Sequence, residues 1–335
     1  MNSCQESSLV GIARLASESV SLVKKRQVSY FELEAKSVLN RCSNPEMPFY
    51  WTINPYRGCE LACKYCYARY THEYMGMEQE QDFERKIYNK KDAARVLDAE
   101  LSAAKLRNRP VAIGTATDPY QPAERRFFTT RSLLEVLAMR SGVALSITTK
   151  SDLVIRDIDI LKQIQKQGTV HVNITITTLK PRLALQLEPK APTPKRRLAA
   201  VKALADEGIP VGVFIMPVIP LLTDDVEGLA RLAKHAKAAG AGYLGARPLF
   251  LMPSARKVFL PFIEKNFPRL LGAYQKRFGS SAYLPEAYGL RIRKQMDSIR
   301  SRYKLAARPP EEFSEALPLS PEQTVFPFSS EAQVG

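Results

Sequence analysis

Short β-rich runs alternate with longer helical runs over most of this chain, and this alternation restricts the fold more than any other feature. We expect strands near residues 49–54, 111–117, 143–149, 170–177, 211–216 and 242–247. A helical segment follows each run, which is typical of parallel strands joined by helical crossovers. The pattern predicts an α/β protein, and periodicity alone leaves open a partly closed barrel and an open doubly wound sheet. In both, the loops after the strands form the active site.

Size and composition exclude several classes of protein. The chain has 335 residues, enough for a core that needs no disulfide or metal to hold it. Hydrophobic residues make up 45% of the sequence and charged residues 25%, as in soluble globular proteins. No apolar run reaches the roughly 18 residues that span a bilayer, and no secretory signal is recognisable at the N-terminus. We therefore expect no membrane-spanning segment and a cytoplasmic location.

The charge of the chain is positive and unevenly distributed. Lys and Arg number 49 against 34 Asp and Glu, and the net charge of +15 favours polyanionic partners. Residues 250–308 hold thirteen Lys or Arg, three acidic residues and nine aromatic residues, a net charge of +10. They include an apolar series with helical spacing: Ile292, Met296, Ile299 and Tyr303. This spacing predicts an amphipathic basic helix, either a solvated helix packed on the domain or a phosphate-binding surface.

Three of the five cysteines lie in one short loop directly after the first predicted strand. Cys59, Cys63 and Cys66 form a C-x3-C-x2-C pattern in the segment NPYRGCELACKYCYARYTH. An odd number of cysteines with this clustering suits a reducing compartment and a cofactor better than a disulfide framework.

Three interpretations of the cysteine loop compete. With His72 as a fourth ligand, the loop can hold zinc in a Cys3His site. Unliganded core cysteines are disfavoured, because the charged residues of the loop make it too polar for a core: Arg57, Glu60, Lys64 and Arg69. The third interpretation is an iron–sulfur cluster held by three cysteines, which leaves one iron without a protein ligand.

The cysteine pattern, with an aromatic residue before the last cysteine and a six-fold β/α repeat around it, resembles the radical S-adenosylmethionine (SAM) superfamily. Four segments resemble its spore photoproduct lyase-like branch more narrowly: INPYRGCELACKYCYA, GTATDPYQPAE, ITITTLKPRLALQLEPKAPTPKRRL and GIPVGVFIMPVIPLLTD. The resemblance covers about residues 36–250. It implies a partial (β/α)6 TIM-type barrel in which Cys59, Cys63 and Cys66 bind a [4Fe-4S] cluster. Reductive cleavage of SAM at that cluster gives a 5′-deoxyadenosyl radical, which abstracts hydrogen from a substrate.

The resemblance also divides the chain and implies a reductant. We expect an N-terminal extension of mixed helix and loop at 1–48 and a radical SAM core at 49–250. A basic, aromatic-rich helical region follows at 251–308, and an acidic tail at 309–335 is expected to be disordered. A small ferredoxin or flavodoxin is the reductant that the family implies.

Roles for other residues follow from matching the family pattern. The resemblance places three groups near the amino end of SAM, although the Gly-Gly-Glu form of that motif is absent: Thr115, Thr117 and Asp118. It assigns Lys150 to the SAM carboxylate and Thr175 or Thr177 to the ribose. An ordinary structural role remains open for each of these residues.

Other residues near the motif have less definite roles. Tyr65 and Tyr67 match tyrosines linked to hydrogen transfer and cofactor packing, or they shield the cluster. Glu188 and Arg197 either form a structural pair or reach the cofactor.

The chain departs from spore photoproduct lyases at one functional position. Those enzymes carry a further cysteine downstream of the cluster motif as a hydrogen donor, and no cysteine follows Cys66 here. We therefore predict a radical SAM enzyme with an unassigned substrate, with DNA or RNA as the leading class because of the basic region. The alternatives are a protein or small-molecule substrate, a zinc-containing nucleic-acid-binding protein, and a non-catalytic iron–sulfur electron carrier or sensor.

Overall fold

The computed structural model describes residues 9–24, 27–45, 47–77, 79–102, 106 and 109–309. A seven-stranded sheet with the order β11-β10-β9-β8-β7-β4-β3 forms the centre of the fold. Six of its strands are mutually parallel: β4 (Trp51–Ile53), β7 (Val111–Ile113), β8 (Ala144–Thr149), β9 (Thr169–Thr175), β10 (Val211–Val218) and β11 (Tyr243–Pro248). Each overlaps one predicted run, so the predicted strand order is confirmed.

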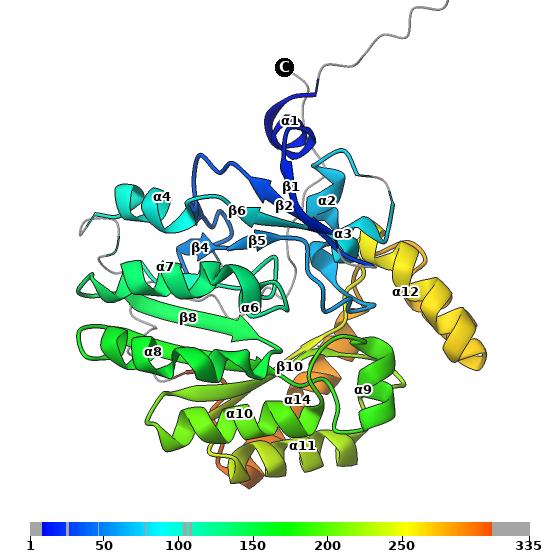
Figure 1. The fold of residues 1–335 in the computed structure, drawn as a ribbon. Helices are drawn as coiled ribbons and strands as arrows, with labels where there is room; N and C mark the ends of the chain where they lie inside the picture. Colours follow the sequence, from blue (N-terminus) through cyan, green and yellow to red (C-terminus); the bar gives the residue numbers. More distant parts are fainter. Residues whose placement is uncertain are drawn as a thin grey trace, which may run out of the picture.

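The parallel sheet is open rather than closed into a complete barrel. Strand β3 (Leu39–Arg41) pairs antiparallel with β4 at one edge, and no pairing joins β3 to β11 in the described part of the chain. Helices connect the strands and lie beside one another along the sheet (Figure 1): α4 (Ala93–Glu100), α7 (Thr129–Ala138), α8 (Ile158–Gln165), α10 (Pro194–Asp206) and α11 (Val226–Ala238). The α/β class and the partial barrel are therefore confirmed.

The two faces of the sheet differ in chemistry. Ile147, Val172 and Val211 lie in register on adjacent strands and are buried in the core that the helices cover. Side chains alternate along a strand, so the opposite face carries the intervening residues. On that face the Asn173 Nδ2 donates to the Thr148 Oγ1 at 3.2 Å. The interior of the partial barrel is thus partly polar.

A second, smaller sheet lies on the side of the cysteine loop. Its order is β1-β2-β6-β5: β1 (Val20–Lys24), β2 (Ser29–Leu33), β6 (Lys86–Lys90) and β5 (Tyr56–Arg57). The expected extension of mixed helix and loop therefore contains strands, with α1 (Gly11–Ser17) before them. Strands β1 and β2 form an antiparallel hairpin, and β2 also pairs with β6, which is distant in sequence.

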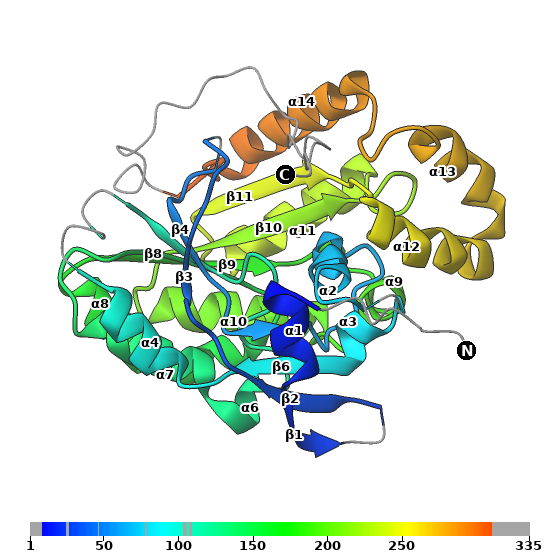
Figure 2. The same cartoon turned by 90° about the horizontal axis from the view of Figure 1, so that it is seen from above.

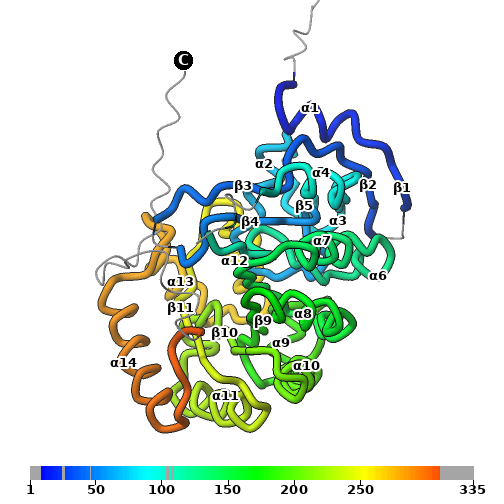
Figure 3. The backbone as a smooth tube through the Cα atoms, turned by 90° about the vertical axis from the view of Figure 1, so that its left-hand side faces the viewer, coloured from blue at the N-terminus to red at the C-terminus, as the bar shows by residue number. Residues whose placement is uncertain are grey.

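The basic region forms helices at the β11 edge of the sheet: α12 (Pro253–Asn266), α13 (Leu271–Phe278) and α14 (Glu286–Tyr303). Helix α14 runs along the outside of β11 and α11 (Figures 2 and 3). Its buried residues are Ile292, Met296 and Ile299, which confirms the predicted helix and its apolar face. No helix of the described residues is long and apolar enough to cross a membrane. Of the predicted acidic tail, residues 310–335 lie outside the described residues.

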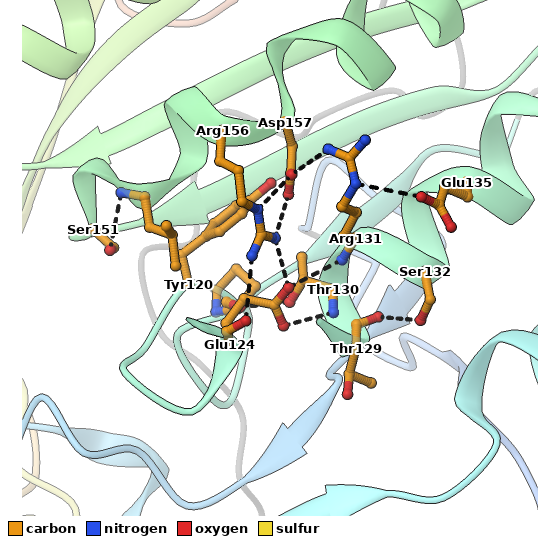
Figure 4. A network of polar contacts seen from close by, with 12 residues as sticks. Tyr120, Glu124, Thr129, Thr130, Arg131, Ser132, Glu135, Ser151, Arg156 and Asp157 are labelled. Carbon is orange, nitrogen blue, oxygen red and sulfur yellow. Dashed lines mark hydrogen bonds and ion pairs between the residues drawn. The ribbon is translucent and has the colours of Figure 1, made fainter. Parts of the chain in front are cut away.

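A buried charge network supports the loops after β7 and β8 (Figure 4). Glu124 begins α6 (Glu124–Phe127), and Asp157 ends the short 3-10 helix η2 (Asp152–Asp157); both side chains are fully buried. Arg156 pairs with both carboxylates at 2.7 Å, and Arg131 pairs with Asp157 at 2.9 Å. Buried charges are tolerated only when they are paired in this way, so the network fixes α6 against η2 and α7.

Candidate active site

The cysteine loop connects β5 to the 3-10 helix η1 (Tyr67–Arg69). Cys59 and Cys63 are 8% and 7% exposed, Cys66 is half-buried, and all three are free thiols. Burial raises the pKa of Cys63 to about 12 and also raises the pKa of Cys59 and Cys66. Asp118, Cys63 and Cys66 raise the pKa of Cys59 further. Thiolates in such a place need a bound cationic group to form.

The surroundings of His72 bear on the alternative of a zinc site. A zinc ion needs four ligands within about 2.3 Å of one point. No three His, Cys, Asp or Glu side chains among the described residues are grouped to hold one ion. The His72 ring packs against Phe83, and its Nε2 lies 3.0 Å from the backbone oxygen of Lys86. His72 is thus held by Phe83 and Lys86, and the described residues give no support to the Cys3His alternative.

Side chains after β7 hold the first turn of the cysteine loop. The Thr117 Oγ1 donates to the Gly58 oxygen at 2.6 Å, and the Gln121 Nε2 donates to the same oxygen at 3.1 Å. The Gln121 Oε1 accepts from the backbone nitrogen of Glu60 at 2.9 Å. Gly58 has φ +79°, and a Cβ there would lie 2.7 Å from the Lys86 oxygen, so only glycine fits. The Thr117 hydroxyl thus positions the loop, and its contact with SAM stays a prediction.

Asn54, directly after β4, orders the neighbouring loop. Its Oδ1 accepts from the Ala116 nitrogen at 2.8 Å, and its Nδ2 donates to the Thr115 Oγ1 at 3.0 Å. The Tyr67 hydroxyl donates to the Thr115 backbone oxygen. Thr115 and Tyr67 therefore lie together beside the cysteine loop, on the edge where the parallel strands end.

Asp118 joins the loops after β7 and β8. Its Oδ1 accepts from the Thr149 Oγ1 at 2.6 Å, and its Oδ2 accepts from the Lys150 backbone nitrogen at 2.7 Å. The negative charge of Asp118 contributes to the raised pKa of Cys59, after burial itself. The carboxylate is thus near the cysteines and held in a fixed orientation.

Lys150 and Tyr65 are in contact. The Lys150 ammonium lies 5.8 Å from the centroid of the Tyr65 ring, a cation–π contact. The buried Tyr65 hydroxyl donates to the Glu188 carboxylate, which also accepts from the Thr177 Oγ1 at 3.2 Å. Burial by itself lowers the pKa of Lys150. The effects of Cys63 and Glu188 are in the other direction, and the pKa is held above its usual value.

The structure brings the predicted residues to one edge of the sheet. Thr175 ends β9, and its backbone oxygen accepts from Arg197 at 3.0 Å. Sequence reasoning missed Asn54 and Gln121, and a polar residue at the end of a buried strand was the available signal for Asn54. For Gln121 the sequence holds no such signal, since its role depends on the path of the cysteine loop.

Residues 53–233, more than half of the chain, match the radical SAM superfamily. The chain belongs to the radical SAM superfamily. An uncharacterized protein of Mycobacterium tuberculosis (strain H37Rv) is 35% identical over 302 residues, covering 89% of this chain and 88% of the relative. An uncharacterized protein of Methanocaldococcus jannaschii is 30% identical over 265 residues, covering 78% and 92%.

Solved structures support the fold of this radical SAM protein. A spore photoproduct lyase variant superposes with a TM-score of 0.61 at 14% identity, covering 82% of this chain and 79% of that one. Spore photoproduct lyase complexed with a dinucleoside spore photoproduct gives a TM-score of 0.58 at 15% identity, covering 86% and 80%. At such identities the similarity shows a shared fold, and the spore photoproduct lyase-like architecture expected from the sequence is confirmed.

Proposed function

We propose that this protein is a radical SAM enzyme that abstracts hydrogen from a nucleic-acid substrate. In this proposal Cys59, Cys63 and Cys66 hold a [4Fe-4S] cluster, and the supporting observation is three free thiols on one loop, two of them buried and one half-buried. When bound, the cluster supplies the electron that cleaves SAM to methionine and a 5′-deoxyadenosyl radical. The protein's own contribution is to hold the thiols, orient SAM and keep water away.

The polar side chains around the cysteine loop would hold SAM. Asp118 offers carboxylate oxygens that can accept from the SAM ammonium, and the Lys150 ammonium can pair with its carboxylate. The remaining members of the proposed SAM site are Thr115, Thr117, Thr175 and Thr177. Tyr65 and Tyr67 are the candidates for hydrogen transfer, since no cysteine follows Cys66 to donate a hydrogen atom to a substrate radical.

Anaerobic reconstitution tests the reaction class. The protein loaded with iron and sulfide, reduced with dithionite and mixed with SAM should produce 5′-deoxyadenosine, measured by chromatography. Product that requires both cluster and reductant would support the proposal. A reducible cluster that yields no 5′-deoxyadenosine, with or without DNA and RNA, would instead indicate an electron carrier or sensor.

Two features support nucleic acid as the substrate class. Ring contacts run from the cysteine loop outwards: Tyr67 lies 5.4 Å from Phe250, and Phe250 stacks on Tyr283 at 5.9 Å between centroids. Arg247 is exposed at the end of β11, near Tyr67. Half-exposed aromatic rings beside a cation are the usual means of stacking bases and binding phosphates. The second feature is the exposed basic face of α14.

Replacing Arg293 and Lys294 of α14 together by alanine should weaken binding of single-stranded oligonucleotides. Both side chains are exposed, so their loss removes phosphate contacts without altering the core. The slope of log K against log salt should fall by about two, roughly one per lost contact. Fluorescence anisotropy over a salt series measures this.

Lys195→Ala provides the matched control, because Lys195 is an exposed lysine on α10. Equal losses of oligonucleotide affinity in this control and in the α14 variant would contradict a binding surface on α14. So would unchanged affinity in the α14 variant.

A further inference from the structure

A buried ion pair beyond β9 reaches the cysteine loop. The Arg197 Nη2 lies 2.5 Å from the Glu188 Oε2, and both side chains are at most 1% exposed. Arg197 also donates to the backbone oxygens of Thr175 at 3.0 Å and Pro192 at 2.8 Å. The guanidinium is therefore fixed by three segments of the chain. Glu188 accepts from the Tyr65 hydroxyl, so the pair is connected to the residue between Cys63 and Cys66.

The backbone around Glu188 also holds the cysteine loop. The Lys64 nitrogen donates to the Leu187 oxygen at 2.9 Å, and the Lys190 nitrogen donates to the Leu61 oxygen at 3.4 Å. Segment 187–190 therefore pairs with segment 61–64 on both sides of Glu188. The distance from the Glu188 carboxylate to the cysteines is thus set by the main chain as well as by Tyr65.

Arg197, Glu188 and Lys150 form a set of three charges beside the loop, in which the negative charge of Glu188 lies between the two positive charges. The Lys150 ammonium lies 5.8 Å from the centroid of the Tyr65 ring, and the Tyr65 hydroxyl donates to the Glu188 carboxylate, which pairs with Arg197. Burial disfavours the charged form of Glu188, but Arg197 and Lys150 hold its pKa below the usual value. Glu188 thus remains ionised between two cations, and all three charges lie around Tyr65, the residue before Cys66, in a site shielded from water.

We propose that Glu188, Arg197 and Lys150 set the reduction potential of the group bound by the cysteine loop. The proposal rests on the cluster assignment above and adds a function for the charged set. Adding an electron to a buried cluster is favoured by nearby positive charge and opposed by nearby negative charge. Glu188 and Arg197 are positioning residues, because they reach the cysteines through Tyr65 and segment 187–190 and not by ligation.

The test is a redox titration of the reconstituted protein without SAM, monitored by electron paramagnetic resonance. Glu188→Gln removes a negative charge with little change of shape and should make the potential more positive. Lys150→Met removes a positive charge and should make it more negative. Arg197→Lys keeps the charge, and its potential should stay closest to that of the wild type.

The direction of the shifts separates an electrostatic role from a structural one. A loop that merely loses support would shift the potential in one direction in both charge-removal variants. Shifts of the same sign, or none, would overturn the proposal, and so would a shift in Arg197→Lys as large as that in Glu188→Gln. Iron and sulfide content is measured first: a wild-type protein that binds no cluster contradicts the proposed function itself, which is a different outcome.

Discussion

Replacing Cys59, Cys63 or Cys66 by alanine should each abolish the bound cluster. In the proposed site each thiol supplies one ligand, and the loop has no other described thiol to take its place. Two remaining cysteines would leave two irons without protein ligands in a site that water enters poorly. The expected result is a colourless protein with little iron after anaerobic reconstitution, measured by absorbance and iron analysis.

Cys42→Ala is the matched control for the ligand assignment. The Cys42 thiol is half-buried and lies 3.7 Å from the Asn44 backbone oxygen, away from the cysteine loop. We expect its variant to reconstitute as the wild type does. Cys4 is also expected to be dispensable, although it lies outside the described residues. Full cluster absorbance in any of the three loop variants would contradict the assignment.

Replacing Glu124 by alanine should lower the free energy of unfolding by about 3–5 kcal/mol. The carboxylate is fully buried and accepts from Arg156 at 2.7 Å and from the Thr130 nitrogen at 2.8 Å (Figure 4). It also accepts from the Tyr56 hydroxyl. Its loss removes one of the two carboxylate partners of Arg156 and leaves the Tyr56 hydroxyl and the backbone nitrogens of Thr130 and Arg131 without their acceptor. Unpaired buried polar groups are costly. Chemical denaturation followed by the fluorescence of Trp51, the single tryptophan, gives the measurement.

Two further variants show whether the charge or the hydrogen bonds matter. Glu124→Gln keeps an acceptor for Thr130 and removes the charge. It should therefore lower the free energy of unfolding by less than Glu124→Ala does. Glu135→Ala should change stability by less than about 1 kcal/mol, because its pair with Arg131 at 3.4 Å is exposed. A Glu124→Ala protein as stable as the Glu135→Ala protein would show that the network contributes little.

The parallel strands and the amphipathic helix were predictable because their signals are local. Each strand is a short apolar run between turn residues, and α14 repeats apolar residues at helical spacing. Periodicity left the closure of the sheet undecided, and only the resemblance to a family indicated the partial barrel. The hairpin of β1 and β2 was missed because the sequence between the two strands has no Gly, Pro, Asn or Asp to indicate a turn. The pairing of β2 with β6 joins segments distant in sequence and has no local pattern.

The site was predictable in its ligands and less so in its supporting residues. The close spacing of the three cysteines is recognisable in the sequence itself. Gln121, in contrast, bonds to a loop whose path the sequence does not reveal. Thr175 and Thr177 were expected to share a face, since strand side chains alternate. The structure connects both to the same buried pair, Thr175 through its backbone oxygen and Thr177 through its hydroxyl.

The supports of the cysteine loop also determine when the loop can form during synthesis. Tyr65 and its partner Glu188 are 123 residues apart, and Phe83, which accepts from the Cys59 nitrogen, also follows the cysteines. All three thiols leave the ribosome well before Leu187 and Glu188 do. A nascent chain therefore exposes the three thiols before their supports exist, and the loop can take up its folded conformation only after β9 and α9 (Pro181–Leu187) have been made. Cells that make this protein need to keep those thiols reduced over that interval.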